Sequence, residues 1–243
     1  MILRDDILST PEIALHLDET TWKIQNKREP DGHMWVMSHR RGAYYMFAPT
    51  RSASVLKEKL AGFKGVTVTD GWKSYETLAS HLGLPHAYCW AHVRREFFPL
   101  KDHDPSIKPI LDKIDRLFAV EREPKNFEIL KRLRLEESST VAAELQEMLV
   151  RELPNSRGES QKRKAIEYTL KRWVGLTLFI DDIRIPMSND EAERTIRHAV
   201  MGRKNYYGSG SHTGAATAAT LFTIIESAKK NDLDPRTFIL ISL

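Results

Sequence analysis

The first part of the chain alternates apolar and polar positions in the short runs typical of β-strands. From Ile13 to Asp18 every second side chain is large and apolar, the period of a half-buried strand. Trp22 and Ile24 extend this run in the opposite phase, and the polar, glycine-ended stretch 26–32 predicts a hairpin-like connection. We expect further strands over residues 34–38, 43–48, 65–69 and 86–89, and helices over 52–60 and 72–82.

From Trp90 onward the pattern changes to helical periodicity. Ile110, Ile114 and Leu117 recur at spacings of three and four, and the run 141–153 does the same until the breaker segment 154–158. We expect further helices around Ile166 to Val174, from Asn189, over 214–230 after a glycine-rich loop at 207–211, and from Asp234-Pro235.

The order of these elements predicts an α/β fold. Three strands, a helix, a strand, a helix and a further strand precede the helices. This order suits a ribonuclease H-like fold, which is a mixed five-stranded sheet flanked by helices.

Composition limits the class of protein. Hydrophobic residues make up 41% of the 243 residues, which is enough for a packed core. The net charge of +4 is compatible with a polyanionic partner and equally with an ordinary basic surface. The acidic start Met1–Asp6 does not resemble a signal peptide, the longest apolar run is too short to span a bilayer, and a single cysteine fits a reducing compartment. We therefore expect a cytoplasmic protein without a membrane partner.

Three carboxylates stand out by their context. Asp18 lies in the first strand, Asp70 follows the fourth strand in an Asp-Gly turn, and Glu193 lies near the start of a helix. A carboxylate on a buried strand is costly unless it is paired or binds a metal. Taken singly, each acid is more simply explained by an edge position, a turn or the helix dipole.

The residues around these acids carry a family resemblance. The chain resembles the bacterial insertion sequence 66 family of transposases over nearly its whole length. The segments that carry the resemblance are Asp18-Glu19-Thr20, Thr69-Asp70-Gly71-Trp72-Lys73-Ser74-Tyr75, Cys89-Trp90-Ala91-His92-Val93-Arg94-Arg95-Glu96-Phe97, Asn189-Asp190-Glu191-Ala192-Glu193-Arg194-Thr195-Ile196-Arg197, Gly202-Arg203-Lys204-Asn205, Gly208-Ser209-Gly210-Ser211 and the stretch 225–235.

The resemblance implies an Asp-Asp-Glu transposase that cleaves DNA strands and joins them at the ends of a mobile element. Asp18, Asp70 and Glu193 would be both the catalytic acids and the ligands of two Mg²⁺ ions, for which Mn²⁺ can substitute. The implied partners are the element's terminal repeats, target DNA and further copies of the chain on DNA. The long interval between Asp70 and Glu193 implies an all-helical insertion before the last catalytic helix. The expected organisation is a first core part over 1–100, the insertion over 101–180 and the C-terminal core helices over 181–243.

The chain departs from the family pattern at a few places. Ser188-Asn189-Asp190 stands where the family usually has Asp-Asn-Asn, and His198 stands where a proline is frequent. Family members usually carry an amino-terminal DNA-binding region. We therefore expect a catalytic fragment, a short variant or a decayed copy.

The acids closest to the proposed ligands are expected to serve other purposes. Glu19 should point to the opposite face of its strand from Asp18, because successive side chains alternate. Glu191 lies roughly 200° around the helix from Glu193, so the two cannot approach one metal ion together.

Cys89 and His92 have a Cys-x-x-His spacing. A zinc site would need more ligands than this single cysteine and its neighbour provide. The alternatives are a buried cysteine with a structural histidine, or a phosphate contact by His92. The second is implied by similarity to the hAT superfamily of transposases, in which a histidine shortly after the second catalytic aspartate lies beside the active site.

Basic side chains around Glu193 are candidate DNA contacts. Arg194, Arg203 and Lys204 are expected to contact phosphates, whereas Arg197 is equally well explained by an ion pair with Glu193 one helical turn away. Trp173 is more simply a core residue than a platform for base stacking.

Three functions remain open from the residues. The first is an active transposase catalytic domain. The second is a truncated, non-catalytic DNA-binding or assembly module, and the third is a nuclease that hydrolyses DNA without joining it. The complete set of acids favours an enzyme, and the family motifs favour transposition.

Overall fold

The computed structural model describes residues 13–122 and 126–242 of the chain. The acidic stretch Met1–Asp6 lies outside the described residues. The chain forms two compact units, one from Met1–His86 with Asn189–Leu243 and one from Ala87–Ser188. Each unit is described by itself.

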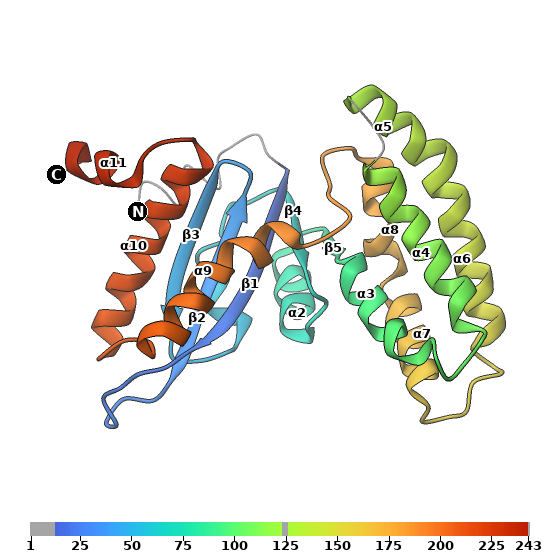
Figure 1. Ribbon diagram of the computed structural model, residues 1–243, viewed down its shortest axis with the longest axis horizontal. Coiled ribbons are helices and arrows are strands. Elements are labelled where there is room, and N and C mark those ends of the chain that lie inside the picture. Colours follow the sequence, from blue (N-terminus) through green and yellow to red (C-terminus); the bar gives the residue numbers. More distant parts are fainter. Residues whose placement is uncertain (1–12, 123–125, 243) are drawn as a thin grey trace. The chain divides into compact units, whose positions relative to one another are not determined.

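The first unit is built on a mixed five-stranded sheet in the order β3-β2-β1-β4-β5 (Figure 1). The central strand β1 pairs antiparallel with β2 and parallel with β4, so the predicted α/β class and the predicted five strands are confirmed. The boundary between the units passes through β5. The strands are β1 (Ala14–Trp22), β2 (Gly32–His39), β3 (Gly42–Ala48), β4 (Val66–Thr69) and β5 (His86–Tyr88).

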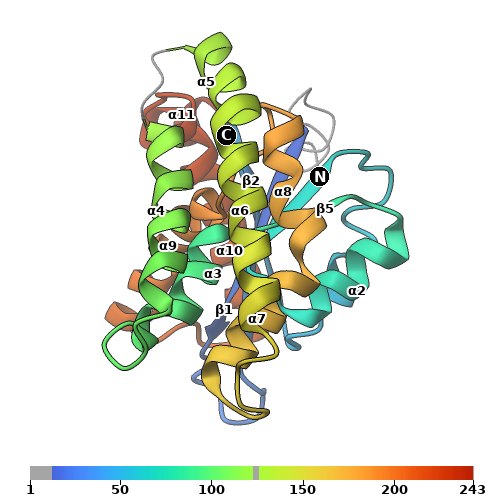
Figure 2. The ribbon, with the colours of Figure 1, turned by 90° about the vertical axis from the view of Figure 1, so that its right-hand side faces the viewer.

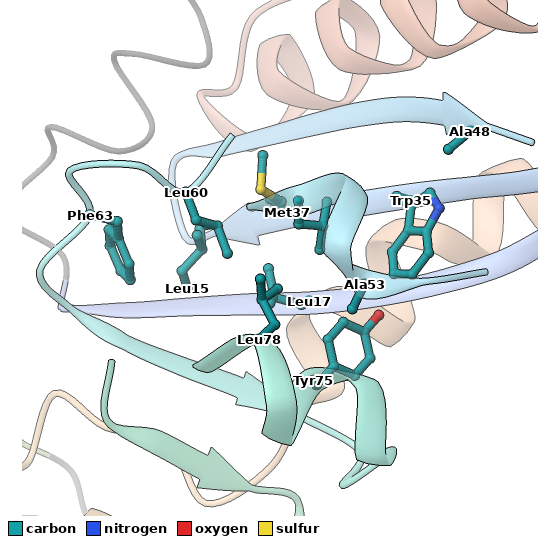
Figure 3. Close-up of a cluster of buried hydrophobic side chains, with 11 residues drawn as sticks. Leu15, Leu17, Trp35, Met37, Ala48, Ala53, Leu60, Phe63, Tyr75 and Leu78 are labelled. Carbon is teal, nitrogen blue, oxygen red and sulfur yellow. The ribbon is translucent and has the colours of Figure 1, made fainter. Parts of the chain in front are cut away.

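One face of this sheet packs on a core with α2 (Lys73–Leu82) and a short 3₁₀ turn, η1 (Ala53–Leu56). Figure 3 shows this core, in which Leu15 and Leu17 of β1 meet Trp35 and Tyr75. The Tyr75 ring packs edge-on against Trp35, with centroids 6.0 Å apart. Odd-numbered side chains of β1 therefore face α2.

The opposite face packs on α9 (Asp190–Tyr206) and α10 (His212–Lys230). Trp22, from the other phase of β1, meets Ala192 and Ile196 of α9 in this second core. In Figure 1, α9 runs across this face of the sheet. Even-numbered side chains of β1 therefore face α9, and the C-terminal helix α11 (Pro235–Ser242) follows.

The predicted helix over residues 52–60 is wrong in extent. Only η1 forms there, started by Ser52, whose hydroxyl accepts from the Ser54 amide. Leu56 and Leu60 are fully buried against the sheet. A hydrophobic loop that covers a core shows the same apolar spacing as a short helix, so periodicity alone does not separate the two.

The second unit is helical, as its periodicity predicts. In Figures 1 and 2, α4 and α6 lie side by side, and Ile110, Ile114 and Leu145 are fully buried in this unit. The helices are α3 (Trp90–Phe97), the 3₁₀ turn η2 (Phe98–Leu100), α4 (Ile107–Arg122), α5 (Phe127–Leu133), the π-helical turn η3 (Arg134–Ser138), α6 (Ser139–Glu152), α7 (Gln161–Lys171) and α8 (Trp173–Asp181).

The helix expected around Ile166 to Val174 is two helices in the structure. Arg172 leaves the helical conformation, with φ −103° and ψ 8°, and separates α7 from α8. No glycine or proline marks this break. Trp173, the first residue of α8, packs edge-on against Trp90, with ring centroids 5.8 Å apart. The break between the two helices therefore coincides with a tertiary contact at the start of α8.

A buried arginine links α4 and α8 of the second unit. Arg134 is 3% exposed and its guanidinium donates to the backbone oxygens of Phe179 at 2.6 Å and Ile185 at 3.1 Å. It also forms a paired ion contact with Glu121, at 2.8 and 2.7 Å. Arg134 thereby satisfies the Phe179 carbonyl in the last turn of α8, where the helix leaves carbonyl groups without partners, and the Ile185 carbonyl in the segment that follows. Among the helices that the structure describes, none combines the length and apolar character that crossing a membrane requires.

Candidate metal centre

Asp18 lies in the central strand β1, on the face covered by α9. Its Oδ1 accepts from the Glu19 amide at 2.8 Å. The pKa of Asp18 is raised to about 7, first by burial and then by the negative charges of Glu19, Asp70 and Glu193. Asp70 and Glu193 are distant from Asp18 in sequence, and their negative charges nevertheless disfavour its ionised form.

Asp70 is oriented by a turn at the end of β4, the parallel neighbour of β1. Its Oδ1 accepts from the Trp72 amide at 2.8 Å, across Gly71. Gly71 has φ +85°, a conformation that glycine adopts at little cost. The Thr69 hydroxyl accepts from the Gly71 amide at 3.3 Å and contacts the His86 ring at 2.8 Å. This network fixes the direction in which the Asp70 carboxylate leaves the strand.

Glu193 lies in the first turn of α9, and Asn189 anchors the start of that helix to β1. Asn189 is 1% exposed; its amide nitrogen donates to the Leu17 oxygen at 2.9 Å and its Oδ1 lies 3.0 Å from His16 Nδ1. Burial lowers the pKa of His16 to about 4, so its ring is neutral at pH 7 and Nδ1 carries the proton that Asn189 accepts. The two residues together hold the turn that carries Glu193 against the strand that carries Asp18.

The structure confirms that Glu19 and Asp18 point to opposite faces of β1. Glu19 accepts from the Tyr75 hydroxyl and from Arg51 Nε, the latter at 2.9 Å, on the α2 side of the sheet. The positive charge of Arg51 therefore compensates Glu19, and Glu19 is unsuited to bind a cation together with Asp18.

Glu191 is likewise engaged elsewhere. It forms an ion pair with Lys230 of α10 and lies 3.7 Å from Arg194. Although burial opposes it, the hydrogen bond from Lys230 lowers the pKa of Glu191. This acid connects α9 to α10.

The four basic side chains that were predicted to contact DNA phosphates differ in their surroundings. Arg203, at the end of α9, donates from Nη1 to Thr20 Oγ1 at 3.2 Å and to the Thr21 backbone oxygen at 2.6 Å, so it joins α9 to β1. Arg194, Arg197 and Lys204 are exposed. The assignment of these four cations to phosphate contacts stays a prediction.

Cys89 and His92 lie in the helical unit. Cys89 is buried and precedes the first residue of α3, and His92 is the third residue of that helix, with its amide 3.2 Å from the Cys89 oxygen. Trp173 is half-buried and packs edge-on against the fully buried Trp90. The role of His92 at phosphate stays a prediction.

Sequence reasoning overlooked the residues that position the acids. The hydrogen bonds of Asn189 reach residues 172 and 173 positions away, and no local pattern reports a contact at that separation. The only local signal for Asn189 is its place directly before a helix that begins with acids. The ion pair between Glu191 and Lys230 leaves no sequence signal of its own.

The donor set fits a hard divalent cation. Asp18, Asp70 and Glu193 offer carboxylate oxygens from β1, the end of β4 and α9, and the strongest charges acting on Asp18 are negative. Clustered carboxylates repel one another until a cation compensates them, and oxygen ligands of this kind suit Mg²⁺ or Mn²⁺.

Comparison with known proteins places this chain among the transposases. The model of the family described as "Transposase IS66 family" matches residues 2–217. The chain belongs to this family, which confirms the resemblance inferred from the motifs.

The curated relatives include proteins of Sinorhizobium fredii (strain NBRC 101917 / NGR234) described as uncharacterized. One, y4hP, is 31% identical over 255 residues, covering 93% of this chain and 46% of that protein. Another, y4jD, is 34% identical over 201 residues, covering 79% of this chain and 39% of that protein. The chain spans less than half the length of these relatives, and no solved structure matches it.

Proposed function

We propose that this chain is the catalytic part of a DNA transposase in which Asp18, Asp70 and Glu193 hold two Mg²⁺ ions, with Mn²⁺ as a substitute. The observation that carries the proposal is that Asp70 and Glu193, which belong to the same unit as Asp18, raise the pKa of its buried carboxyl through their negative charges. Membership of the transposase family supplies the substrate class, which is the DNA of the element's terminal repeats and of the target.

We further propose that the fold is ribonuclease H-like and that the helical unit is an insertion into it. Support comes from the strand order β3-β2-β1-β4-β5, with β1 antiparallel to β2 and parallel to β4. The first unit is made of two sequence segments, and the helical unit occupies the chain between them.

The residues have distinct tasks in the proposed reaction. Bound divalent ions would supply charge compensation for the phosphate and a more acidic water or 3′-hydroxyl. Asp18 and Asp70 present carboxylates from neighbouring strands of a rigid sheet, and Asn189 fixes the approach of Glu193. Arg194, Arg197, Arg203 and Lys204 would place the DNA backbone, which positions the strand without reading its sequence. His92 would contact a phosphate.

The test is cleavage and strand transfer on DNA carrying the element's own terminal repeats, with Mg²⁺, with Mn²⁺ and with EDTA. We expect metal-dependent cleavage by the unaltered chain. Asp18→Asn, Asp70→Asn and Glu193→Gln should each abolish it while DNA binding persists, because the charge that holds the metal is lost and the shape is kept.

Glu191→Gln is the matched control, since it removes a carboxylate from the same helix turn. We expect this variant to retain metal-dependent cleavage. Cleavage that survives in all three variants of the proposed ligands would contradict the assignment. DNA binding without any cleavage by the unaltered chain would favour a non-catalytic assembly module.

A further inference from the structure

The helical unit contains a cleft of about 640 Å³ between α3 and α4. Three of the side chains that line it are arginines, Arg94, Arg95 and Arg122, and among its described lining residues Asp115 alone is acidic. The cleft lies entirely within one compact unit, and the proposed metal centre uses none of these residues. An excess of arginine in a concave site favours a ligand with several negative charges.

Arg94 and Asp115 form the fixed wall of the cleft. Arg94 donates to both carboxylate oxygens of Asp115, at 2.6 and 3.2 Å. Its guanidinium also lies 4.9 Å from the centroid of the Phe98 ring. Because Arg94 already compensates Asp115, the charges of Arg95 and Arg122, both exposed, are available to a ligand.

An exposed aromatic ring borders the same cleft. Phe98 is 41% exposed, and the amino group of Lys101 lies 4.0 Å from its ring centroid. An aromatic ring beside several cations is the arrangement with which proteins bind nucleic acid strands, where cations contact phosphates and rings contact sugars or bases. The guanidinium group also matches the geometry of phosphate, to which it can donate two parallel hydrogen bonds.

We propose that this cleft binds the phosphodiester backbone of a DNA strand, with Arg95 and Arg122 at phosphates and Phe98 against a sugar or base. The choice of DNA rests on the proposed function. The inference goes beyond that function because it gives the helical unit a phosphate-binding cleft on α3 and α4, in addition to the contact proposed for His92.

The test measures DNA affinity as a function of salt by fluorescence anisotropy, with a labelled duplex and the matching single strand. Arg95→Ala/Arg122→Ala should lower the slope of log K against log salt by about 1 to 2, since each lost phosphate contact reduces it by roughly 0.7 to 0.9. Affinity at moderate salt should fall about tenfold. The matched control is Arg151→Ala/Arg157→Ala, which removes two exposed arginines of the same unit outside the cleft, and its slope should stay close to that of the unaltered chain.

Asp115→Asn should change the DNA affinity in the opposite direction. It removes the negative charge from the cleft and releases Arg94, so we expect tighter DNA binding by about two- to fivefold, in keeping with one additional phosphate contact. Arg95→Lys/Arg122→Lys keeps the charge and should preserve most of the slope. Circular dichroism verifies that each variant is folded.

The outcomes separate this proposal from the proposed function. Equal slopes for the cleft and control variants, in a chain that binds and cleaves DNA, would overturn the cleft and leave the transposase assignment standing. Weaker binding by Asp115→Asn would also overturn it. A lower salt slope for Arg95→Ala/Arg122→Ala, in a chain that shows no metal-dependent cleavage, would support DNA binding by the cleft and contradict the catalytic proposal. An unaltered chain that binds no DNA would overturn both.

Discussion

Asp18 illustrates how a single residue of the candidate centre lowers the stability of the fold that holds it. Its pKa is raised from 3.8 to about 7, first by burial and then by neighbouring acids. The folded chain therefore binds this proton more tightly than the unfolded chain. The contribution of Asp18 to the free energy of unfolding is therefore most favourable below pH 4. It decreases as the pH rises toward 7, and above pH 7 the ionised carboxylate destabilises the fold by its full amount.

We predict that Asp18→Asn stabilises the protein at pH 8 in EDTA, by about 1 to 4 kcal/mol, because a shift of about three pKa units corresponds to roughly 4 kcal/mol at most. The difference from the unaltered chain should shrink as pH falls and vanish near pH 4. Urea unfolding at several pH values measures it.

Asp31→Asn is the control with the opposite sign. Hydrogen bonds from Lys23 and from the Ile24 amide lower the pKa of Asp31, so its carboxylate stabilises the fold above its unfolded pKa and this contribution is lost as pH falls. Its replacement should be neutral or slightly destabilising at pH 8. An Asp18→Asn variant that is less stable than the unaltered chain at pH 8 in EDTA would show that the acids do not repel one another as inferred.

At the scale of elements, α9 is fixed to β1 at both of its ends. Asn189 holds its first turn and Arg203 its last. The glycine-rich loop that follows pairs with the extension of β1, where the Ser209 amide donates to the Lys23 oxygen at 3.0 Å and the Gln25 amide to the Ser209 oxygen at 2.8 Å. The loop therefore stabilises the position of the helix that carries Glu193.

We predict that Gly208→Ala destabilises the first unit by about 2 to 4 kcal/mol, the range of a strained backbone combined with a steric clash. Gly208 has φ +94°, and a Cβ there would lie 2.1 Å from the Lys23 backbone oxygen. Gly210→Ala is the control, because a Cβ at Gly210 meets no atom within 4 Å. Its effect on the free energy of unfolding, measured by urea titration, should stay within about 0.5 kcal/mol. Equal effects would mean that the loop is not held against β1.

The same elements show how far the sequence alone predicts this structure. The strands were predicted correctly, and alternate side chains of β1 and β2 pack into two different cores on opposite faces of the sheet. The predicted helix at 52–60 was wrong because a covering loop buries Leu56 and Leu60 with helical spacing. The break at Arg172 was missed because no proline or glycine marks it and the packing of Trp173 on Trp90 is not visible in local sequence.

The candidate site was predictable in part. Context and family resemblance selected Asp18, Asp70 and Glu193, and strand alternation correctly placed Glu19 on the opposite face of β1 from Asp18. The buried pair His16 and Asn189 could not be predicted, because it depends on how α9 meets β1 in three dimensions.

At the scale of the whole molecule, the proposed metal ligands come from three distant segments of one unit, and the helical unit contributes none of them. A cation that bridges β1, the end of β4 and α9 would oppose every opening that separates these segments. A ligand at about 100 times its Kd stabilises the state that binds it by roughly 2.7 kcal/mol. Openings confined to the helical unit leave the three acids in place and gain no such protection.

We predict that Mn²⁺ slows amide hydrogen exchange in β1, β4, α9 and α10 and leaves α4 and α6 unchanged. Mass spectrometry of peptides from the unaltered chain, with Mn²⁺ and with EDTA, measures this directly. Asp70→Asn is the control, because it removes one proposed ligand at the end of β4 and should abolish the protection in all four elements together. Protection of α4 and α6 equal to that of the sheet would mean that the ion is bound by the helical unit or that the two units open as one. Protection limited to α9 would mean that Glu193 binds the ion without the strands, and the assignment of Asp18 and Asp70 would then be wrong.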